Sequence, residues 1–345
     1  MADLKNNLFY YATKELSQDA FICWLCSYAL KDADNSDLKL VECARKLVFE
    51  FMKRGIGENI RFEDIALKDV EKQVGNIDVL LTAEYHGKTY KIIVEDKTHT
   101  SEHDNQLIRY KDQINDDAEI IGIYFKTGFQ SDLSKVHDAG YKVYNREDIL
   151  ALLRACETEN AILKSFREYW ENFDNLAKCY KELPFNEWPD WQTVNGFYDE
   201  MQKKLCEDGL WAGYGYVSNP SGGFWGLWYG PNNDSIETDG FKAVLYLQIE
   251  IKWNYSTGRY DSRICTKLED QSEIKNDSKI LELRQAIIEK QNKYGYRKPG
   301  RMRWGTVMTV GEYDYDDDNM TYSMFTETIL ESVKSYNLLM DDLRS

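Results

Sequence analysis

The sequence predicts an α/β protein of two domains, in which a mixed sheet flanked by helices is followed by a second, tryptophan-rich α+β domain. Segments with helical and strand spacing alternate through the first half in the order helix, strands, helix, strand. Seven of the nine Trp residues follow Leu183, so the second half has a different character. A length of 345 residues fits about two domains, at roughly 100–200 residues per domain.

The elements of the first half follow from the spacing of apolar residues. Helical spacing over residues 13–30 and 38–54 predicts two helices, and Gly55 and Gly57 end the second. Strand-like runs follow, and His86 with Gly87 forms a turn that joins two of them into a hairpin. The expected strands are residues 60–67, 75–85, 88–97, 120–125 and 141–144, and the further helices are residues 102–114, 146–156 and 160–182.

Pro184 and Pro189 mark the boundary between the domains, which we place at 1–182 and 183–345. A long strand is expected over residues 241–253. Helical spacing predicts helices over residues 278–292 and 322–343. The glycine-rich residues between aromatic runs at 212–230 predict turns between strands, so the second domain is expected to be α+β with a β-rich aromatic core.

Charge and composition limit the function. The 43 Lys and Arg against 59 Asp and Glu give a net charge of −16, which argues against a protein that coats nucleic acid non-specifically. A metal-dependent enzyme with a local basic groove remains open. No apolar run approaches the length of a membrane span, and the first residues lack an apolar signal core. The seven scattered Cys indicate reduced thiols and a cytoplasmic protein.

Asp78, Glu95 and Lys97 form the constellation that predicts chemistry. Side chains alternate along a strand, so Glu95 and Lys97 project from the same face at the end of an apolar run. Burying such ions is costly unless they pair or bind a metal. Asp78 lies on the preceding strand of the hairpin, and its carboxylate can reach the same place. Two carboxylates and a lysine predict a Mg²⁺ site.

Gln106 and Tyr110 add an amide and a phenol to this constellation. They are four residues apart and therefore share one face of the expected helix. That helix leaves the strand of Glu95 after a short turn, so its face can be directed at the same site. Two plainer interpretations stay open: a surface ion pair for Glu95 with Lys97, and a solvated helix face for Gln106 with Tyr110.

These motifs resemble those of the PD-(D/E)xK nuclease superfamily. Asp78 matches the first Asp, and Glu95 with Lys97 matches the acid-x-lysine triplet. Gln106 and Tyr110 match the Q-x-x-x-Y element of the RecB-type branch. The resemblance covers about residues 1–155 and implies a restriction-endonuclease-like core with Mg²⁺ or Mn²⁺ as cofactor.

The resemblance also implies a third metal ligand from the first helix, and Glu15 is the matching position. The carboxylates of Glu15, Asp78 and Glu95 are thus the expected metal ligands. Asp19 lies four residues after Glu15 and is an alternative acid. Asp96 points away from Glu95 and is expected to be structural.

Other motifs have plainer interpretations. Cys23 and Cys26 form a C-x-x-C on an apolar helix face, which favours core packing over zinc. His99 and His103 are expected in a solvated loop, with contact to a substrate phosphate as the alternative. The acidic run at residues 314–318 lacks the glycine and terminal glutamate of a calcium loop and is expected to be solvated.

A cationic, aromatic stretch at residues 290–304 is the candidate nucleic-acid-binding segment. Interleaved basic and aromatic residues suit contact with phosphates and stacking on bases. A solvated loop that balances an acidic protein is the alternative. The candidate contacts are Arg297, Lys298, Arg301, Arg303 and Trp304.

The expected function is therefore a divalent-metal-dependent nuclease that hydrolyses phosphodiester bonds, with DNA rather than RNA as substrate. The second domain would select the nucleic acid or bind a protein partner, and no membrane partner is expected. A setting in defence or phage biology is part of the expectation. The alternative is a non-catalytic module that keeps the nuclease scaffold and binds nucleic acid or protein; binding of Mg²⁺ or Mn²⁺ would separate the two.

Overall fold

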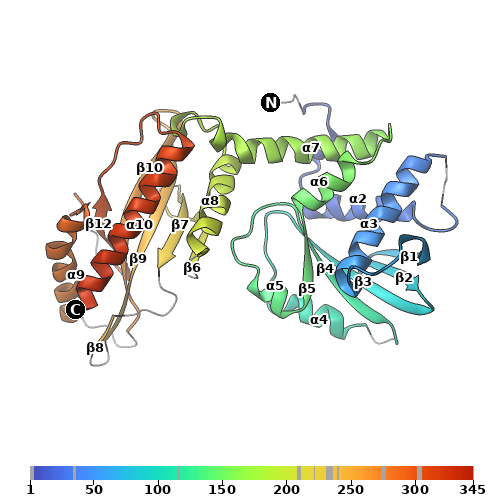
Figure 1. Cartoon of the computed structure of the whole chain (residues 1–345), viewed down its shortest axis with the longest axis horizontal. Coiled ribbons are helices and arrows are strands. Elements are labelled where there is room, and N and C mark those ends of the chain that lie inside the picture. Colours follow the sequence, from blue (N-terminus) through green and yellow to red (C-terminus); the bar gives the residue numbers. More distant parts are fainter. Residues whose placement is uncertain are drawn as a thin grey trace. The chain divides into compact units, whose positions relative to one another are not determined.

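The computed structural model describes residues 4–33, 36–114, 117–207, 211–220, 222–230, 236–238, 241–272, 277–300 and 305–344. The chain forms two compact units, Met1–Asp174 and Asn175–Ser345 (Figure 1). We predicted the boundary after residue 182 from the two prolines, whereas the division between the units follows Asp174. Within the described residues, no helix is long and apolar enough to cross a lipid bilayer.

A five-stranded mixed sheet forms the centre of the first unit. Its order is β1-β2-β3-β4-β5. The first three strands are antiparallel, whereas β3 pairs with β4, and β4 with β5, in parallel. This confirms the predicted mixed sheet. The strands are β1 (Ile65–Val74), β2 (Ile77–Tyr85), β3 (Lys88–Lys97), β4 (Glu119–Lys126) and β5 (Tyr141–Asn145).

Helices cover both faces of this sheet (Figure 1). On one face, Phe51 of α3 packs edge-on against Phe125 of β4. On the other, Tyr124 of β4 shares a buried cluster with Leu107 and Tyr110 of α4. The helices of this unit are α1 (Leu8–Tyr11), α2 (Glu15–Ser27), α3 (Leu38–Ile56), α4 (Gln106–Asp112), α5 (Ser134–Asp138) and α6 (Arg146–Arg154), followed by α7 (Ala161–Lys178).

Two element boundaries were predicted wrongly. The first strand begins at Ile65, because residues Phe62–Asp64 form a 3-10 turn. It runs on to Val74, because its mostly polar second half pairs with β2. Helix α4 begins at Gln106 instead of residue 102. Asp104 and Asn105 have φ values of 42° and 55°, a left-handed conformation that a right-handed helix cannot include.

The second unit is an antiparallel sheet with helices. Its order is β11-β12-β10-β9-β7-β6, and β8 pairs with β9. The described strands are β6 (Trp211–Val217), β7 (Phe224–Gly230), β8 (Ile236–Thr238), β9 (Phe241–Asn254), β10 (Arg259–Asp270), β11 (Tyr296–Arg297) and β12 (Val307–Tyr313). The helices are α8 (Trp191–Cys206), α9 (Asp277–Gln291) and α10 (Tyr322–Arg344), with 3-10 turns at Cys179–Lys181, Phe185–Glu187 and Asn292–Tyr294.

Helix α8 is one of the elements of this unit that the sequence did not predict, as are β10 and β12. It carries Asn195 and Gly196 in its middle, two residues of low helix propensity. Burial compensates: Phe197 is fully buried and stacks on Phe325 of α10, with the ring centroids 5.0 Å apart. Some aromatic residues of this unit therefore pack between helices α8 and α10 rather than within the sheet.

Gly196 lies where α8 passes the end of α7, and we predict that Gly196→Ala destabilises the protein. A Cβ atom there would stand 1.9 Å from the Ala177 carbonyl oxygen, which is main chain and cannot simply rotate away. Overpacking of this kind costs about 1–3 kcal/mol, so thermal unfolding should occur several degrees lower. Gly300→Ala, whose Cβ would have no atom of the described residues within 4 Å, is the matched control and should leave the melting temperature unchanged. Equal melting temperatures for both variants would contradict the close approach.

Candidate active site

The β2–β3 hairpin brings the two predicted carboxylates together. Val79 pairs with Val94 across the ladder, so Asp78 comes beside Glu95 at the end of β3. The Asp96 main-chain N–H donates a hydrogen bond of 3.0 Å to Asp78 Oδ2 and fixes that carboxylate. Glu95 is fully buried, which contradicts the interpretation of a surface pair.

Lys97 is also buried and lies among oxygen atoms. Its Nζ donates to Glu95 Oε1 and to the Asp96 carbonyl at 3.2 Å, and it stands 4.0 Å from Asp78 Oδ2. Burial alone would lower the pKa of Lys97, but the charge and hydrogen bond of Glu95, together with the charges of Asp78 and Glu15, outweigh burial and the pKa is raised. The ammonium is therefore a fixed positive charge at the end of the sheet.

Helix α4 directs Gln106 and Tyr110 at the same carboxylate. Gln106 Nε2 donates to Glu95 Oε1 at 2.6 Å and to the Tyr110 hydroxyl at 2.7 Å. Tyr110 is only 5 % exposed. The solvated helix face that we kept open is thus contradicted, and the structure joins α4 to β3 through polar side chains.

Glu15, at the start of α2, faces the turn that follows β3. Its Oε1 accepts hydrogen bonds from the Thr98 N–H at 2.9 Å and from Thr100 Oγ1 at 2.7 Å. Burial opposes the ionised form, but the hydrogen bonds from Thr100 and Thr98 and the charge of Lys97 outweigh it, so the pKa of Glu15 lies below its usual range. Glu15 is therefore an ionised group beside Lys97.

The two carboxylates on the sheet, in contrast to Glu15, have raised pKa values. Burial, and next the negative charge of Asp78, raise the pKa of Glu95 to about 8. Burial also raises the pKa of Asp78. Glu95 Oε2 is buried and meets no hydrogen-bond donor among the described residues. Each group would gain from a cation placed between them.

Asp19 and Asp96 belong to the opposite side of β3. Gln18 of α2 donates to Asp96 Oδ1 and, at 3.0 Å, to Thr127 Oγ1. Burial, and next the charge of Asp78, raise the pKa of Asp19 to about 7, and burial raises that of Asp96. As predicted from the strand alternation, Asp96 turns away from Glu95, and its bond to Gln18 attaches α2 to the sheet.

The donor set fits a hard divalent cation in its chemistry. Asp78 and Glu95 supply carboxylate oxygens from adjacent strands, one of them buried without a donor, and Glu15 adds a third carboxylate. Across the described ranges, no three His, Cys, Asp or Glu side chains already surround one point as metal ligands. The side chains would therefore have to close around an ion.

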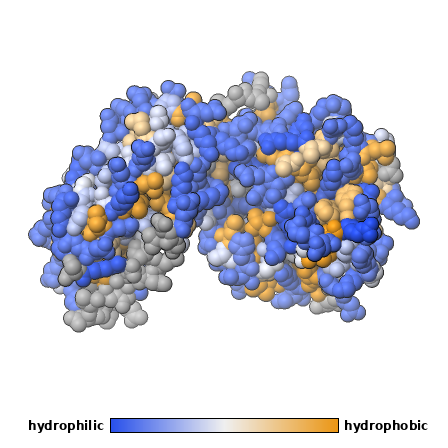
Figure 2. Space-filling view, in the orientation of Figure 1, coloured by the Kyte–Doolittle hydropathy of each residue, from blue (hydrophilic) through white to orange (hydrophobic). Residues whose placement is uncertain are grey.

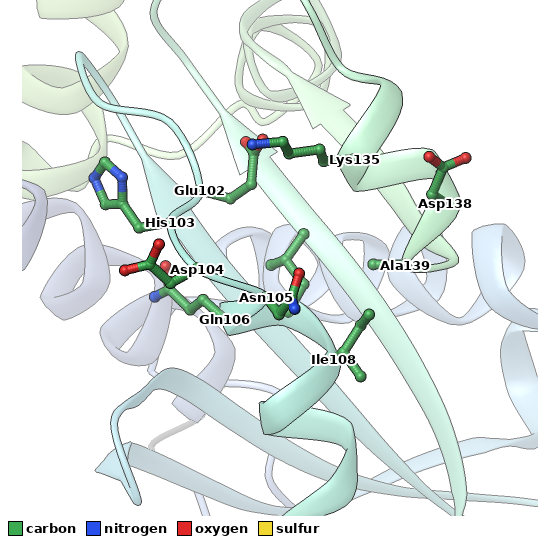
Figure 3. Close-up of a pocket in the computed structure, with 10 residues that line it drawn as sticks. Glu102, His103, Asp104, Asn105, Gln106, Ile108, Lys135, Asp138 and Ala139 are labelled. Atoms are coloured by element: carbon green, nitrogen blue, oxygen red, sulfur yellow. The ribbon is translucent and has the colours of Figure 1, made fainter.

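A cavity of about 540 Å³ adjoins this site beside α4. Figure 3 shows Asp104, Asn105 and Gln106 on one side of it and Lys135 and Asp138 of α5 on the other. Gln106 thus borders both the cavity and Glu95. The lining is more acidic than basic, and it consists of Glu102, His103, Asp104, Asn105, Gln106, Leu107, Ile108, Lys135, Asp138 and Ala139.

The candidate nucleic-acid-binding stretch lies in the second unit and is partly neutralised. Arg297 lies 3.6 Å from Glu312 and 3.5 Å from Asp314, and Lys298 is exposed. Arg301, Arg303 and Trp304 lie outside the described residues. The role of this stretch stays a prediction.

The remaining motifs take plain positions. Cys26 is fully buried in α2 and Cys23 is half-buried. His99 and His103 are both exposed. In the acidic loop after β12, Asp317 accepts a hydrogen bond of 2.9 Å from the Ser262 N–H of β10, and Asp318 accepts one of 2.7 Å from Arg259, so several members of that run bond to the rest of the unit and the expectation of a solvated loop is wrong for them.

A sequence model of the PD-(D/E)XK nuclease superfamily matches residues 7–182, a stretch that contains the whole β2–β3–α4 site and Glu15. The chain belongs to the PD-(D/E)XK nuclease superfamily. No curated protein and no solved structure matched the chain. PD-(D/E)XK nucleases act on nucleic acid and typically use divalent metal ions, and the fold of the first unit is consistent with a restriction-endonuclease-like core. Membership of the Q-x-x-x-Y branch stays a prediction.

Sequence reasoning missed several polar residues that support this PD-(D/E)XK site. Gln18, Thr98 and Thr100 bond to Asp96 or Glu15, and Lys126 is buried at the end of β4. Only Lys126 carried a signal, since a lysine that ends an apolar strand repeats the pattern of Lys97. The others are common residues whose partners are distant in sequence.

The raised pKa of Glu95 predicts how the metal-free protein responds to pH. The native state keeps the Glu95 proton up to about pH 8, whereas an unfolded glutamic acid loses it near pH 4.5, so stability falls as pH rises through this window. Glu95→Gln cannot ionise. We expect its melting temperature relative to wild type, measured with a chelator, to be higher at pH 8.5 than at pH 5.

The matched control is Glu331→Gln, which changes an exposed glutamate of α10 and should show the same difference from wild type at both pH values. A difference between Glu95→Gln and wild type that does not change with pH would mean that Glu95 ionises normally in the folded protein.

Proposed function

We propose that this chain is a divalent-metal-dependent nuclease that hydrolyses phosphodiester bonds in DNA rather than RNA, with Mg²⁺ or Mn²⁺ as its ion. One observation carries the proposal. At the end of β3, a buried lysine and two carboxylates meet, and an amide from α4 is bonded to one of them. A purely structural ion pair does not need this second carboxylate or a buried oxygen without a donor.

Asp78 and Glu95 would hold the ion, with Glu15 as a third ligand. When bound, a divalent ion makes a water molecule more acidic and offsets negative charge on the phosphate. The chain prepares this binding: the Asp96 N–H orients Asp78, and Gln106 orients Glu95. Because the pKa of Glu95 is about 8, its proton must leave when a cation binds.

Lys97, Gln106 and Tyr110 would act on the substrate and the attacking water. The Lys97 ammonium is fixed within reach of both carboxylates, where it can hold a water or stabilise negative charge that develops on the phosphate. Tyr110 accepts a hydrogen bond from Gln106 and so restrains the amide that touches Glu95.

The cavity beside α4 supports access for the nucleotides that flank the cleaved bond. Its lining holds three carboxylates, from Glu102, Asp104 and Asp138, against the cation of Lys135. A polyanion would be repelled from such a lining unless a metal ion compensates the charge. Dependence on a divalent ion thus follows from the charge around the site as well as from its ligands.

The second unit is proposed to select the substrate or to bind a protein partner. Arg297 and Lys298 are its described candidate phosphate contacts, to which Arg301, Arg303 and Trp304 are added from the sequence. A phosphate at Arg297 would compete with Glu312 and Asp314, so the contact would be weak by itself. We propose a cytoplasmic location, because all seven cysteines are free thiols.

Cleavage of nucleic acid tests the proposal directly. With Mg²⁺ or Mn²⁺, the wild type should cleave DNA, assayed as linear, circular and single-stranded substrates beside RNA. Asp78→Asn and Lys97→Ala should each lower the rate by about 100-fold or more, since each removes a charge that acts in the transition state. Lys97→Ala should retain metal affinity, because the lysine is not a ligand.

Lys334→Ala, which changes an exposed lysine of α10, is the control for loss of a positive charge and should cleave like wild type. Nucleic-acid binding without cleavage under every metal condition would identify the chain as a non-catalytic binding module and overturn the proposed activity.

Thermal stabilisation by metal provides a test that does not depend on substrate. Mg²⁺ or Mn²⁺ should raise the melting temperature more at pH 8 than at pH 5.5, because the ion must displace the protons that the raised pKa values of Glu95 and Asp78 retain. At 100 times the dissociation constant, stabilisation amounts to about 2.7 kcal/mol. Asp78→Asn should reduce the shift, and an unchanged shift in that variant would place the ion elsewhere.

A further inference from the structure

Lys126 is a buried cation that the proposed chemistry does not use. It ends β4 and is paired in parallel register with Lys97, and only 4 % of it is exposed. A buried ammonium beside a second cation is costly unless acceptors surround it. Two main-chain carbonyls do so: Lys126 Nζ donates to the Thr98 oxygen at 3.2 Å and to the Thr100 oxygen at 2.6 Å.

The same two threonines hold Glu15. The Thr98 N–H and the Thr100 hydroxyl both donate to Glu15 Oε1. The turn of residues 98–100 therefore lies between Lys126 and Glu15. Lys126 donates to the carbonyl oxygens of the turn, and Glu15 accepts hydrogen bonds from its N–H and hydroxyl groups. Burial lowers the pKa of Lys126 to about 8, against the negative charges of Glu15 and Asp96, so the lysine remains mostly charged at neutral pH.

The main chain of the residues after Lys126 also contacts this turn. The Thr127 N–H donates to the Lys97 carbonyl at 3.3 Å. A Cβ atom on Gly128 would lie 1.9 Å from the Thr98 carbonyl oxygen, so only glycine allows this approach. The turn is thus fixed on the side of β4 by Lys126 and by the backbone of Gly128.

We propose that Lys126 is a positioning residue that fixes the turn of residues 98–100 and, through it, holds the Glu15 carboxylate at the proposed metal site. Lys126 itself contacts neither Glu15 nor the other proposed ligands by a hydrogen bond or ion pair in the described structure. Its action is indirect: it holds the carbonyl oxygens of Thr98 and Thr100, the same two residues whose N–H and hydroxyl donate to Glu15. The link to metal binding rests on the proposed function, whereas the link from Lys126 to Glu15 does not.

Hydrogen exchange of the Thr98 amide, measured without metal, tests the link from Lys126 to Glu15. In Lys126→Met, which keeps the chain length and removes the charge, exchange at Thr98 should become at least about tenfold faster. Lys126→Arg should restore much of the protection. The matched control is Lys111→Met, because Lys111 also donates to a main-chain carbonyl, that of Ala139 at 2.6 Å, and does not touch the turn. Unchanged exchange at Thr98 in Lys126→Met would overturn the proposal.

A double-mutant cycle with Glu15→Gln tests the link to the metal. Lys126→Met should weaken Mn²⁺ affinity, measured by calorimetry, by about 10–100-fold, the usual effect of removing a group behind a ligand. In the Glu15→Gln background the same change should cost nothing further. Equal losses in both backgrounds would show that Lys126 acts on overall stability and would overturn its positioning role.

The outcomes separate this inference from the proposed function. If the wild type binds no Mn²⁺ and cleaves nothing, the proposed function fails, while exchange at Thr98 still decides whether Lys126 positions Glu15. If Lys126→Met does not fold, Lys126→Gln replaces it, since this change removes the charge that the Thr98 and Thr100 carbonyls hold and keeps a polar side chain. It should weaken Mn²⁺ binding only when Glu15 is present, and a loss without Glu15 would contradict the proposal.

Discussion

The burial of Glu95 and Lys97 at the end of one apolar strand is the constraint on which the first unit depends. Ile93 and Val94 are fully buried in β3, and of the two ions that follow, Glu95 is fully buried and Lys97 is 7 % exposed. Burying such a pair is costly unless further polar groups bond to it. The hairpin supplies Asp78, and α4 supplies Gln106. The helices that cover the sheet are therefore joined to it by polar contacts as well as by apolar packing.

The two sides of β3 differ in their polar contacts. On the side of Glu95, burial and the charge of Asp78 raise its pKa, and one oxygen lacks a donor within the described structure, so the arrangement gains from an added cation. On the side of Asp96, Gln18 and Thr127 form a network that attaches α2, although Asp96 Oδ2 and Asp19 Oδ1 are also buried without a hydrogen-bond partner among the described residues. Because Glu15 begins the same helix, this attachment also determines where the third proposed ligand lies.

A partly buried glutamate in the second unit provides a contrast. Glu250 of β9 lies 2.7 Å from Lys267 and 2.8 Å from Arg263, and although burial opposes ionisation, these two cations hold its pKa below the usual range. That carboxylate has its charge compensated and no reason to bind an ion. Glu95, with one lysine and a second acid beside it, has a raised pKa. The difference between a structural ion pair and a candidate active site is thus the balance of charge, which burial alone does not indicate.

The sequence by itself determined the mixed sheet, the β2–β3 hairpin and the set Asp78, Glu95 and Lys97, because strand periodicity and a tight turn are local properties. Local sequence patterns did not predict the elements that are stabilised by residues distant in the sequence. The charged strand β1 forms through its ladder with β2, and α8 forms around Gly196 through burial of Phe197. Only the tertiary structure placed Lys126 beside the turn that holds Glu15. A buried charge must be offset by hydrogen-bond acceptors, and here the fold supplies two main-chain carbonyls. Main-chain carbonyls are present at every residue, so no sequence spacing indicates which ones a buried lysine will contact.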